Sequence, residues 1–211
     1  AHFRSTRCPF SYSERGRTRN LYWGLIAKHY PRAERKEIKF QTEWVKSHIE
    51  DFRRWLDGRP FVFIAGNHDY ARPCEILADN GISAVDITNS FYQFKDFLFY
   101  GIPYITYMAG EWNYERTGTE MSREVDIMYR KFLEYGFPDV LCAHSPLAGI
   151  LDTFAGTSFG NHVLLNKMLY EWEKMPKYYL HGHVHSGGIS NLNGMYVSNA
   201  ATTSRLIEIQ K

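Results

Sequence analysis

The chain has 211 residues, of which 44% are hydrophobic and 16% aromatic, so a substantial core can form and wholesale disorder is excluded. This length suits one compact domain, and we expect residues 1–211 to form a single unit. The net charge of +2 excludes no class of protein, but residues 4–39 hold ten Lys or Arg against three Glu. Such a region attracts anionic substrates or nucleic acid, or is simply a solvated surface segment.

The first elements that the sequence predicts are a loop, a strand and a helix. Residues 3–20 are basic and show no apolar period, which indicates a loop or an insertion, and the apolar run 21–27 indicates a strand. Apolar side chains recur at spacings of three and four over residues 37–56, which predicts an amphipathic helix ended by Asp57-Gly58.

Short apolar strands and helices alternate over the rest of the chain. Residues 61–65 read as a strand buried on both faces, and a helix runs from Pro73 to Asn80-Gly81. We predict further strands at 90–94, 97–102, 139–143, 178–180, 195–197 and 206–209, and further helices at 122–135 and 163–172. This order indicates an α/β (α+β) fold.

Polar, metal-competent residues follow three of these strands at the point where each one ends. They are Gly66-Asn67-His68-Asp69, His144-Ser145-Pro146 and the segment His181-Gly182-His183-Val184-His185. Loops at the carboxyl ends of strands are where α/β sheets assemble their sites, so the three clusters are expected to converge.

The histidine segment is the strongest of these signals. Histidines two apart in an extended segment point the same way, so two of them can hold one ion, and neutral imidazole is a common metal ligand. The small Gly182 is expected to let the backbone approach closely. The alternative is a surface cluster of histidines that binds no metal. Asn-His-Asp alone is often only a turn, and a lone His144 is often structural. These residues indicate a metal site only because all of them occur at strand ends in the same chain.

These motifs resemble the third, fourth and fifth signature motifs of the calcineurin-like metallophosphoesterases. From about residue 61 to 200 the chain is similar to the metallophosphoesterase-domain (239AB-type) phosphodiesterase branch. The shared segments include Tyr-Gly-Ile-Pro at 100–103, His-Ser-Pro at 144–146, Gly-Ile-Leu-Asp at 149–152 and Gly-His-x-His at 182–185.

The resemblance implies a two-sheet β-sandwich flanked by helices, with a pair of divalent metals (Mn²⁺, Fe²⁺/Fe³⁺ or Zn²⁺). It implies that one metal is bound by Asn67, His144 and His183, and that the other is bound by His185. It further implies that His68 protonates the leaving group and that Asp69 orients it. Two such metals clamp a phosphate and generate a hydroxide at neutral pH, so no nucleophilic side chain is needed.

Two upstream motifs of the family are incomplete here. Ala1-His2-Phe3 matches the end of Asp-x-His-Phe, which would make His2 a ligand, and the chain starts with Ala rather than Met, which suggests missing residues. No Gly-Asp occurs, and Ala27-Lys28-His29 stands where it is expected. The chain is therefore incomplete, a divergent member with one metal or weak activity, or a pseudoenzyme. Without a bridging carboxylate, two dications roughly 4 Å apart repel by on the order of 16 kcal/mol, which favours one metal.

Two functions remain open. The first is metal-dependent phosphoester hydrolysis, a diester being favoured over a monoester. The second is a catalytically weak or inactive scaffold that binds nucleic acid or protein. The substrate is a phosphate ester, with nucleotides and nucleic acids among the candidates. The aromatic stretch 104–114, which contains Trp112, is suited to stack a base or simply to pack in the core.

Cysteine usage and hydropathy bear on the compartment. The three scattered cysteines include no CxxC pair, which argues against a disulfide framework or a zinc finger and fits a reducing compartment. No apolar run approaches the ~20 residues of a transmembrane helix, and no signal peptide is visible. We therefore expect a cytoplasmic protein with no membrane partner. The sequence does not indicate an oligomeric state.

Overall fold

The computed structural model describes residues 30–108 and 112–210. The loop predicted at 3–20, the strand predicted at 21–27, and the residues His2 and His29 lie outside the described residues. None of the described helices is long and apolar enough to cross a membrane.

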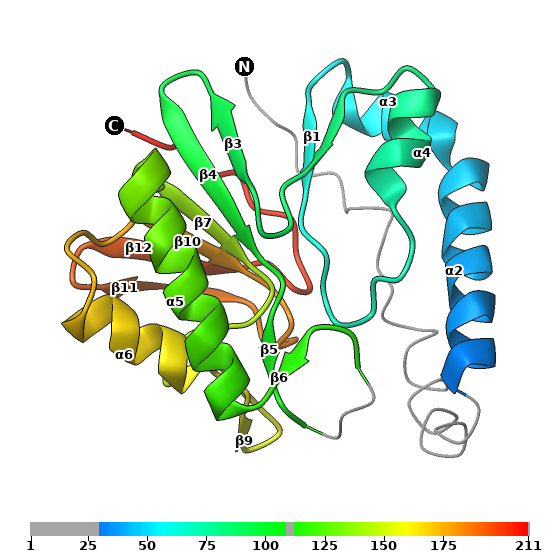
Figure 1. Ribbon diagram of the computed structural model, residues 1–211. Helices are drawn as coiled ribbons and strands as arrows, with labels where there is room; N and C mark the ends of the chain where they lie inside the picture. The colour runs from blue at the N-terminus through cyan, green and yellow to red at the C-terminus, as the bar shows by residue number, and fades with distance from the viewer. Residues whose placement is uncertain (1–29, 109–111, 211) are drawn as a thin grey trace.

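A six-stranded mixed sheet forms the centre of the fold (Figure 1). Four neighbouring strands are parallel, which places their carboxyl ends at one edge of the sheet, and an antiparallel strand closes each side. In sheet order the strands are β11 (Gly188–Leu192), β12 (Met195–Asn199), β10 (Tyr178–His181), β7 (Val140–Ala143), β4 (Phe97–Ile102) and β3 (Phe91–Phe94).

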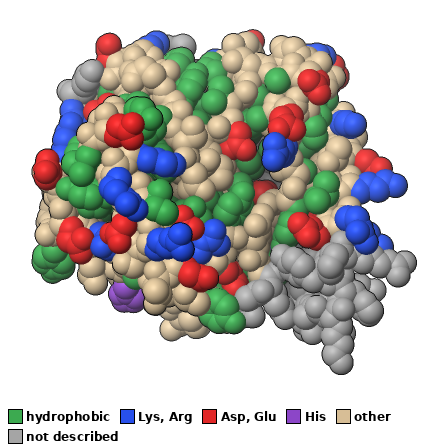
Figure 2. All heavy atoms as spheres, viewed as in Figure 1, with side chains coloured by type: hydrophobic (Ala, Val, Ile, Leu, Met, Phe, Trp, Pro, Cys, Tyr) green, Lys and Arg blue, Asp and Glu red, His purple; other side chains and the backbone are tan. Residues whose placement is uncertain are grey.

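Helices α5 (Gly118–Tyr135) and α6 (His162–Tyr170) cover one face of this sheet (Figure 1). The core between them contains the fully buried side chains of Tyr100, Phe132 and Tyr179. Burying such large rings contributes most of the apolar driving force in this layer. The visible outer surface mixes basic and acidic side chains (Figure 2). Between the two helices, Lys167 of α6 pairs with Asp126 of α5 at 2.6 Å.

A second layer packs beside the sheet. Strands β1 (Phe61–Phe63) and β2 (Ala84–Asp86) form a parallel pair, and their core is shared with three helices. Just after β2, Thr88 forms a β-bridge with Gly101 of β4. A Cβ at Gly101 would lie 2.2 Å from the Ile87 carbonyl oxygen. The glycine therefore allows the two layers to meet. The helices are α2 (Tyr30–Ser47), α3 (Ile49–Leu56) and α4 (Pro73–Asp79).

Two short strand pairs complete the described elements. Strands β5 (Ile105–Thr106) and β6 (Glu115–Arg116) are parallel, and β8 (Thr153–Phe154) and β9 (Thr157–Ser158) form a hairpin. Both pairs belong to the loops that follow β4 and β7, which lead away from the carboxyl edge of the sheet.

The structure confirms the mixed α/β class and most predicted elements, and it corrects several boundaries. The helix predicted at 37–56 is two helices, because the ring of His48 stacks on Trp44 and its Nδ1 lies 2.7 Å from the Trp44 carbonyl oxygen. The strand predicted at 61–65 spans three half-buried residues, since a two-stranded sheet shields its members less than a larger one.

Two further corrections concern the C-terminal half. The helix predicted at 122–135 begins at Gly118, because Thr117 and Glu120 form a reciprocal capping box. Residues 206–209 are not a strand. Both edges of β12 are already paired, with β11 and β10, so this last segment has no ladder to join there.

Candidate metal centre

The ends of β1 and β7 bring Asn67 and His144 together. The chain leaves β1 through the buried Gly66-Asn67 step, and His144 follows β7 directly. Nε2 of His144 lies 2.7 Å from Oδ1 of Asn67, although 77 residues separate them in sequence. Two metal-competent side chains from different strand ends therefore meet at one point.

This approach requires a glycine at position 66. A Cβ there would lie 2.5 Å from Cε1 of His144, which is closer than real Cβ contacts. The expectation for Gly182 was wrong, because a Cβ at that position would meet no atom within 4 Å. The imidazole of His144 packs on the backbone of Gly66, and Gly66 is the residue that allows the ligands to converge.

His183 joins this pair from the end of β10. Its ring centroid lies 4.9 Å from that of His144, and the two strands β7 and β10 are direct parallel neighbours. The segment is not extended as predicted: His183 has a φ of 63°, and the Val184 amide donates to the Gly182 carbonyl. The turn separates His183 from His181, whose buried Nε2 has no hydrogen-bond partner among the described residues.

The electrostatics of these imidazoles suit metal binding. Burial, reinforced by the neighbouring histidines, lowers the pKa of His144 well below its usual range. Burial also lowers the pKa of His183 to about 4, with His68 and His185 adding to the shift. Both rings are therefore neutral at pH 7, which is the form that coordinates a metal.

His68 and His185 lie at the surface of the site. His68 is exposed, and its ring centroid lies 4.5 Å from that of Trp112. His185 is also exposed, with its ring centroid 6.4 Å from that of Phe154. It is one of the neighbouring histidines that add to the lowered pKa of His144 and His183. The two exposed imidazoles are accessible to a ligand.

The carboxylate of Asp69 faces the backbone of its own motif. It accepts a hydrogen bond of 2.7 Å from the Gly66 amide, which closes the turn. Burial raises the pKa of Asp69 to about 6, and the charge of Asp86 adds to this shift, while the Gly66 hydrogen bond opposes it. The carboxylate is therefore mainly ionised at pH 7 and adds a negative charge beside His68.

The described donors match part of a metal site. One amide oxygen and two neutral imidazoles converge, which is a donor set that divalent metals accept. Within 30–108 and 112–210, no three His, Cys, Asp or Glu side chains gather closely enough to enclose an ion by themselves. Asn67 would supply the third donor here; of the two other predicted ligands, His185 is exposed and His2 lies outside the described residues.

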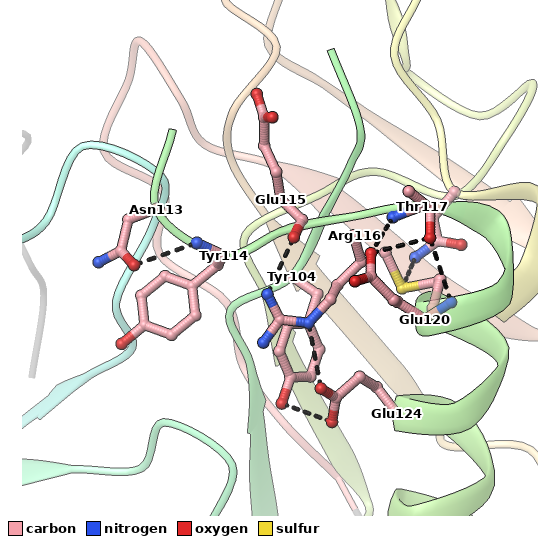
Figure 3. Close-up of polar contacts among 10 residues, drawn as sticks. Tyr104, Asn113, Tyr114, Glu115, Arg116, Thr117, Glu120 and Glu124 are labelled. Carbon is pink, nitrogen blue, oxygen red and sulfur yellow. Dashed lines mark hydrogen bonds and ion pairs between the residues drawn. The ribbon is translucent and has the colours of Figure 1, made fainter. Parts of the chain in front are cut away.

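Sequence reasoning missed two amide side chains beside the site. Gln41 of α2 donates to the His68 carbonyl at 2.7 Å, and Asn113 donates to the Asp69 carbonyl at 2.7 Å. The segment that carries Asn113 is held to α5 by Arg116, Glu124 and Tyr104 (Figure 3). No local motif marks either amide, because each acts on a backbone turn far away in sequence.

Comparisons with known proteins identify a family and a fold. The family model described as calcineurin-like phosphoesterase matches residues 25–187. One crystal structure is similar over 84% of this chain and 75% of its own, with 18% identity and a TM-score of 0.55, and this likeness shows the fold alone. A Staphylococcus aureus protein proposed to be a 5'-nucleotidase, solved with alpha-ketoglutarate, is similar over 73% of this chain and 34% of its own, with 13% identity and a TM-score of 0.44.

A search of curated proteins finds no match. The family match covers most of the chain, and it includes the ends of β1, β7 and β10 together with Asn67, His144 and His183. Members of this family are generally metal-dependent hydrolases of phosphoesters. The chain belongs to the calcineurin-like phosphoesterase family.

Proposed function

We propose that the protein hydrolyses phosphodiesters with the help of divalent metal ions. The observation that carries this proposal is the meeting of Asn67 and His144 at 2.7 Å beside His183, next to the exposed imidazole of His68. A buried set of neutral ligands with an exposed proton donor at its rim is the arrangement that this hydrolysis needs.

Each residue has a distinct part in the proposal. Asn67, His144 and His183 hold one ion, and His185, together with His2, belongs to a second position. Bound divalent ions, with Mn²⁺ as the first candidate, supply Lewis-acid polarisation of the phosphoryl oxygens and a nucleophile at neutral pH. His68 donates a proton to the leaving oxygen, and Asp69, whose carboxylate accepts from the Gly66 amide, holds the turn that carries the imidazole.

Turnover separates this proposal from the scaffold alternative. With added Mn²⁺, the protein is expected to hydrolyse bis(p-nitrophenyl) phosphate, and His144→Ala is expected to lose both bound metal and activity. Metal content by elemental analysis and release of nitrophenol measure the two effects. A wild-type protein that binds phosphodiesters but never cleaves them, at any Mn²⁺ concentration, would favour the inactive scaffold.

We further propose a nucleotide as the substrate class, supported by the place of Trp112. The indole is half-buried and contacts the ring of His68, which we assign to the leaving group. A base carried by the leaving alcohol would therefore meet an aromatic surface. Stacking on an aromatic side chain contributes about 1–3 kcal/mol per base, which is roughly 5- to 150-fold in affinity.

Two phosphates that differ only in the base test this substrate class. Wild-type protein is expected to bind AMP at least about tenfold more tightly than ribose 5-phosphate, measured by calorimetry without turnover. Trp112→Leu should bring the two affinities together, whereas Trp112→Phe should retain most of the difference. Equal affinities in the wild-type protein would rule out a base platform at Trp112.

A further inference from the structure

The turn that carries His68 is held by side chains from two distant segments. His68 lies outside any strand or helix, in the irregular stretch between β1 and α4, and its side chain is exposed. Its ring centroid lies 4.5 Å from that of Trp112. The position of the imidazole also depends on how the backbone of residues 67–71 is held.

Gln41 holds this backbone from the side of α2. Its Nε2 donates to the His68 carbonyl at 2.7 Å, and its Oε1 accepts from the amides of Tyr70 and Ala71 at 2.9 and 3.0 Å. The second Nε2 hydrogen donates to the carboxylate of Glu37 at 3.0 Å. These four hydrogen bonds use both donors and both acceptor positions of the amide, and the side chain is buried.

Asn113 holds the same turn from the opposite segment. Its Nδ2 donates to the Asp69 carbonyl at 2.7 Å, and its backbone amide donates to the Asn67 carbonyl at 3.2 Å. Its Oδ1 accepts from the Tyr114 amide, which fixes the direction of the side chain (Figure 3). Together with Gln41, it satisfies the carbonyls of three successive residues, of which His68 is the central one.

The segment of Asn113 is itself anchored on α5. Arg116 donates to Glu124 at 3.1 Å, Tyr104 donates to the other carboxylate oxygen of Glu124 at 2.9 Å, and the guanidinium of Arg116 lies 4.7 Å from the centroid of the Tyr104 ring. Figure 3 shows these groups gathered between the β5–β6 segment and the start of α5. Through these contacts, the segment that holds the turn is itself fixed to α5, a helix packed on the central sheet.

We infer that Gln41 and Asn113 are positioning residues that fix the His68 imidazole against the leaving group. This inference rests on the proposed function. Neither side chain needs to touch the substrate, because each acts through the backbone on either side of His68. A displacement of about 1 Å in a reacting group lowers rates by roughly 100-fold, so loss of either amide is expected to act on kcat rather than on KM.

Gln41→Met and Asn113→Leu remove the amides with little change of volume. Each is expected to lower kcat by about 10- to 100-fold with KM changed less than about threefold. The loss should grow along a series of aryl methyl phosphodiesters as the leaving phenol becomes a poorer leaving group, because only a poor one needs the proton of His68. Asn161→Ala, which removes a buried amide that caps α6, controls for lost stability.

A double-mutant cycle shows whether Gln41 and Asn113 act on kcat through His68. In a His68→Ala background, Gln41→Met and Asn113→Leu should each change kcat by less than about twofold, because the group they position is gone. Equal losses with and without His68 would overturn the positioning role, as would normal kcat in both single variants. Absence of turnover in the wild-type protein would instead overturn the proposed function and this role with it.

Hydrogen exchange of residues 66–71 measures how firmly the turn is held and does not depend on catalytic activity. The amides of Tyr70 and Ala71 donate to Gln41, so their exchange should become at least about tenfold faster in Gln41→Met, while exchange in β7 stays unchanged. Unchanged exchange at both amides would show that Gln41 does not hold the turn, and would overturn the inference on its own.

Discussion

Replacing His68 by Ala should lower turnover of phosphodiesters by about 10²- to 10⁴-fold, the usual effect of removing a positioned acid. Bound metal should stay close to the wild-type level, because the exposed imidazole lies at the rim of the site and not among the buried donors. Steady-state kinetics and elemental analysis on the same preparation measure both quantities.

The leaving group provides the control for this prediction. The loss should be smallest for nitrophenyl esters, since nitrophenolate departs without a proton, and largest for alkyl esters. Loss of metal in His68→Ala would make this residue a ligand, and an equal loss for all leaving groups would show that it does not act as an acid.

Replacing Gly66 by Ala should disrupt the metal centre without touching a ligand. The added methyl would lie 2.5 Å from Cε1 of His144, so the imidazole or the backbone at position 66 must shift, which changes how His144 meets Asn67. We expect metal affinity to fall by about 10- to 100-fold, as it does when the groups that orient a ligand are lost, and activity to fall with it. Overpacking should also lower the free energy of unfolding by about 1–3 kcal/mol.

Gly182→Ala is the matched control, because it makes the same change beside another ligand. A Cβ at Gly182 meets no atom within 4 Å, so metal affinity and stability should stay within about twofold and about 0.5 kcal/mol of the wild type. Competition with a chelator measures the affinities. Equal losses in the two variants would show that the contact between Gly66 and His144 does not govern the site.

The sequence predicted that Asn67, His144 and His183 come together, because strand ends are visible in it. The runs before Asn67, His144 and His183 are short and apolar, and each ends abruptly in polar residues. The register of β7 with β10, and the packing of Gly66 on His144, then bring those ends together. Side chains at the ends of regular elements can therefore be placed from the sequence.

The features that the sequence did not predict depend on single tertiary contacts, which leave no periodic pattern in the sequence. Gln41 lies on a helix whose apolar spacing was recognised, but nothing local shows that its amide faces the turn at His68. At the break, the side chains of Ser47 and His48 take the place of the backbone donor at the Trp44 carbonyl, and the His48 amide donates to Val45 instead. Such contacts appear only once the tertiary structure is known.

The position of a bound metal decides whether Asn67, His144 and His183 form a metal centre. Crystals grown with Zn²⁺ or Mn²⁺ and measured by anomalous diffraction should show a peak in contact with Oδ1 of Asn67 and with ring nitrogens of His144 and His183. For zinc, the nitrogen–metal distances should be about 2.0–2.2 Å. A fully occupied metal bound elsewhere, with Asn67 still hydrogen-bonded to His144 at an empty site, would contradict the proposed metal centre.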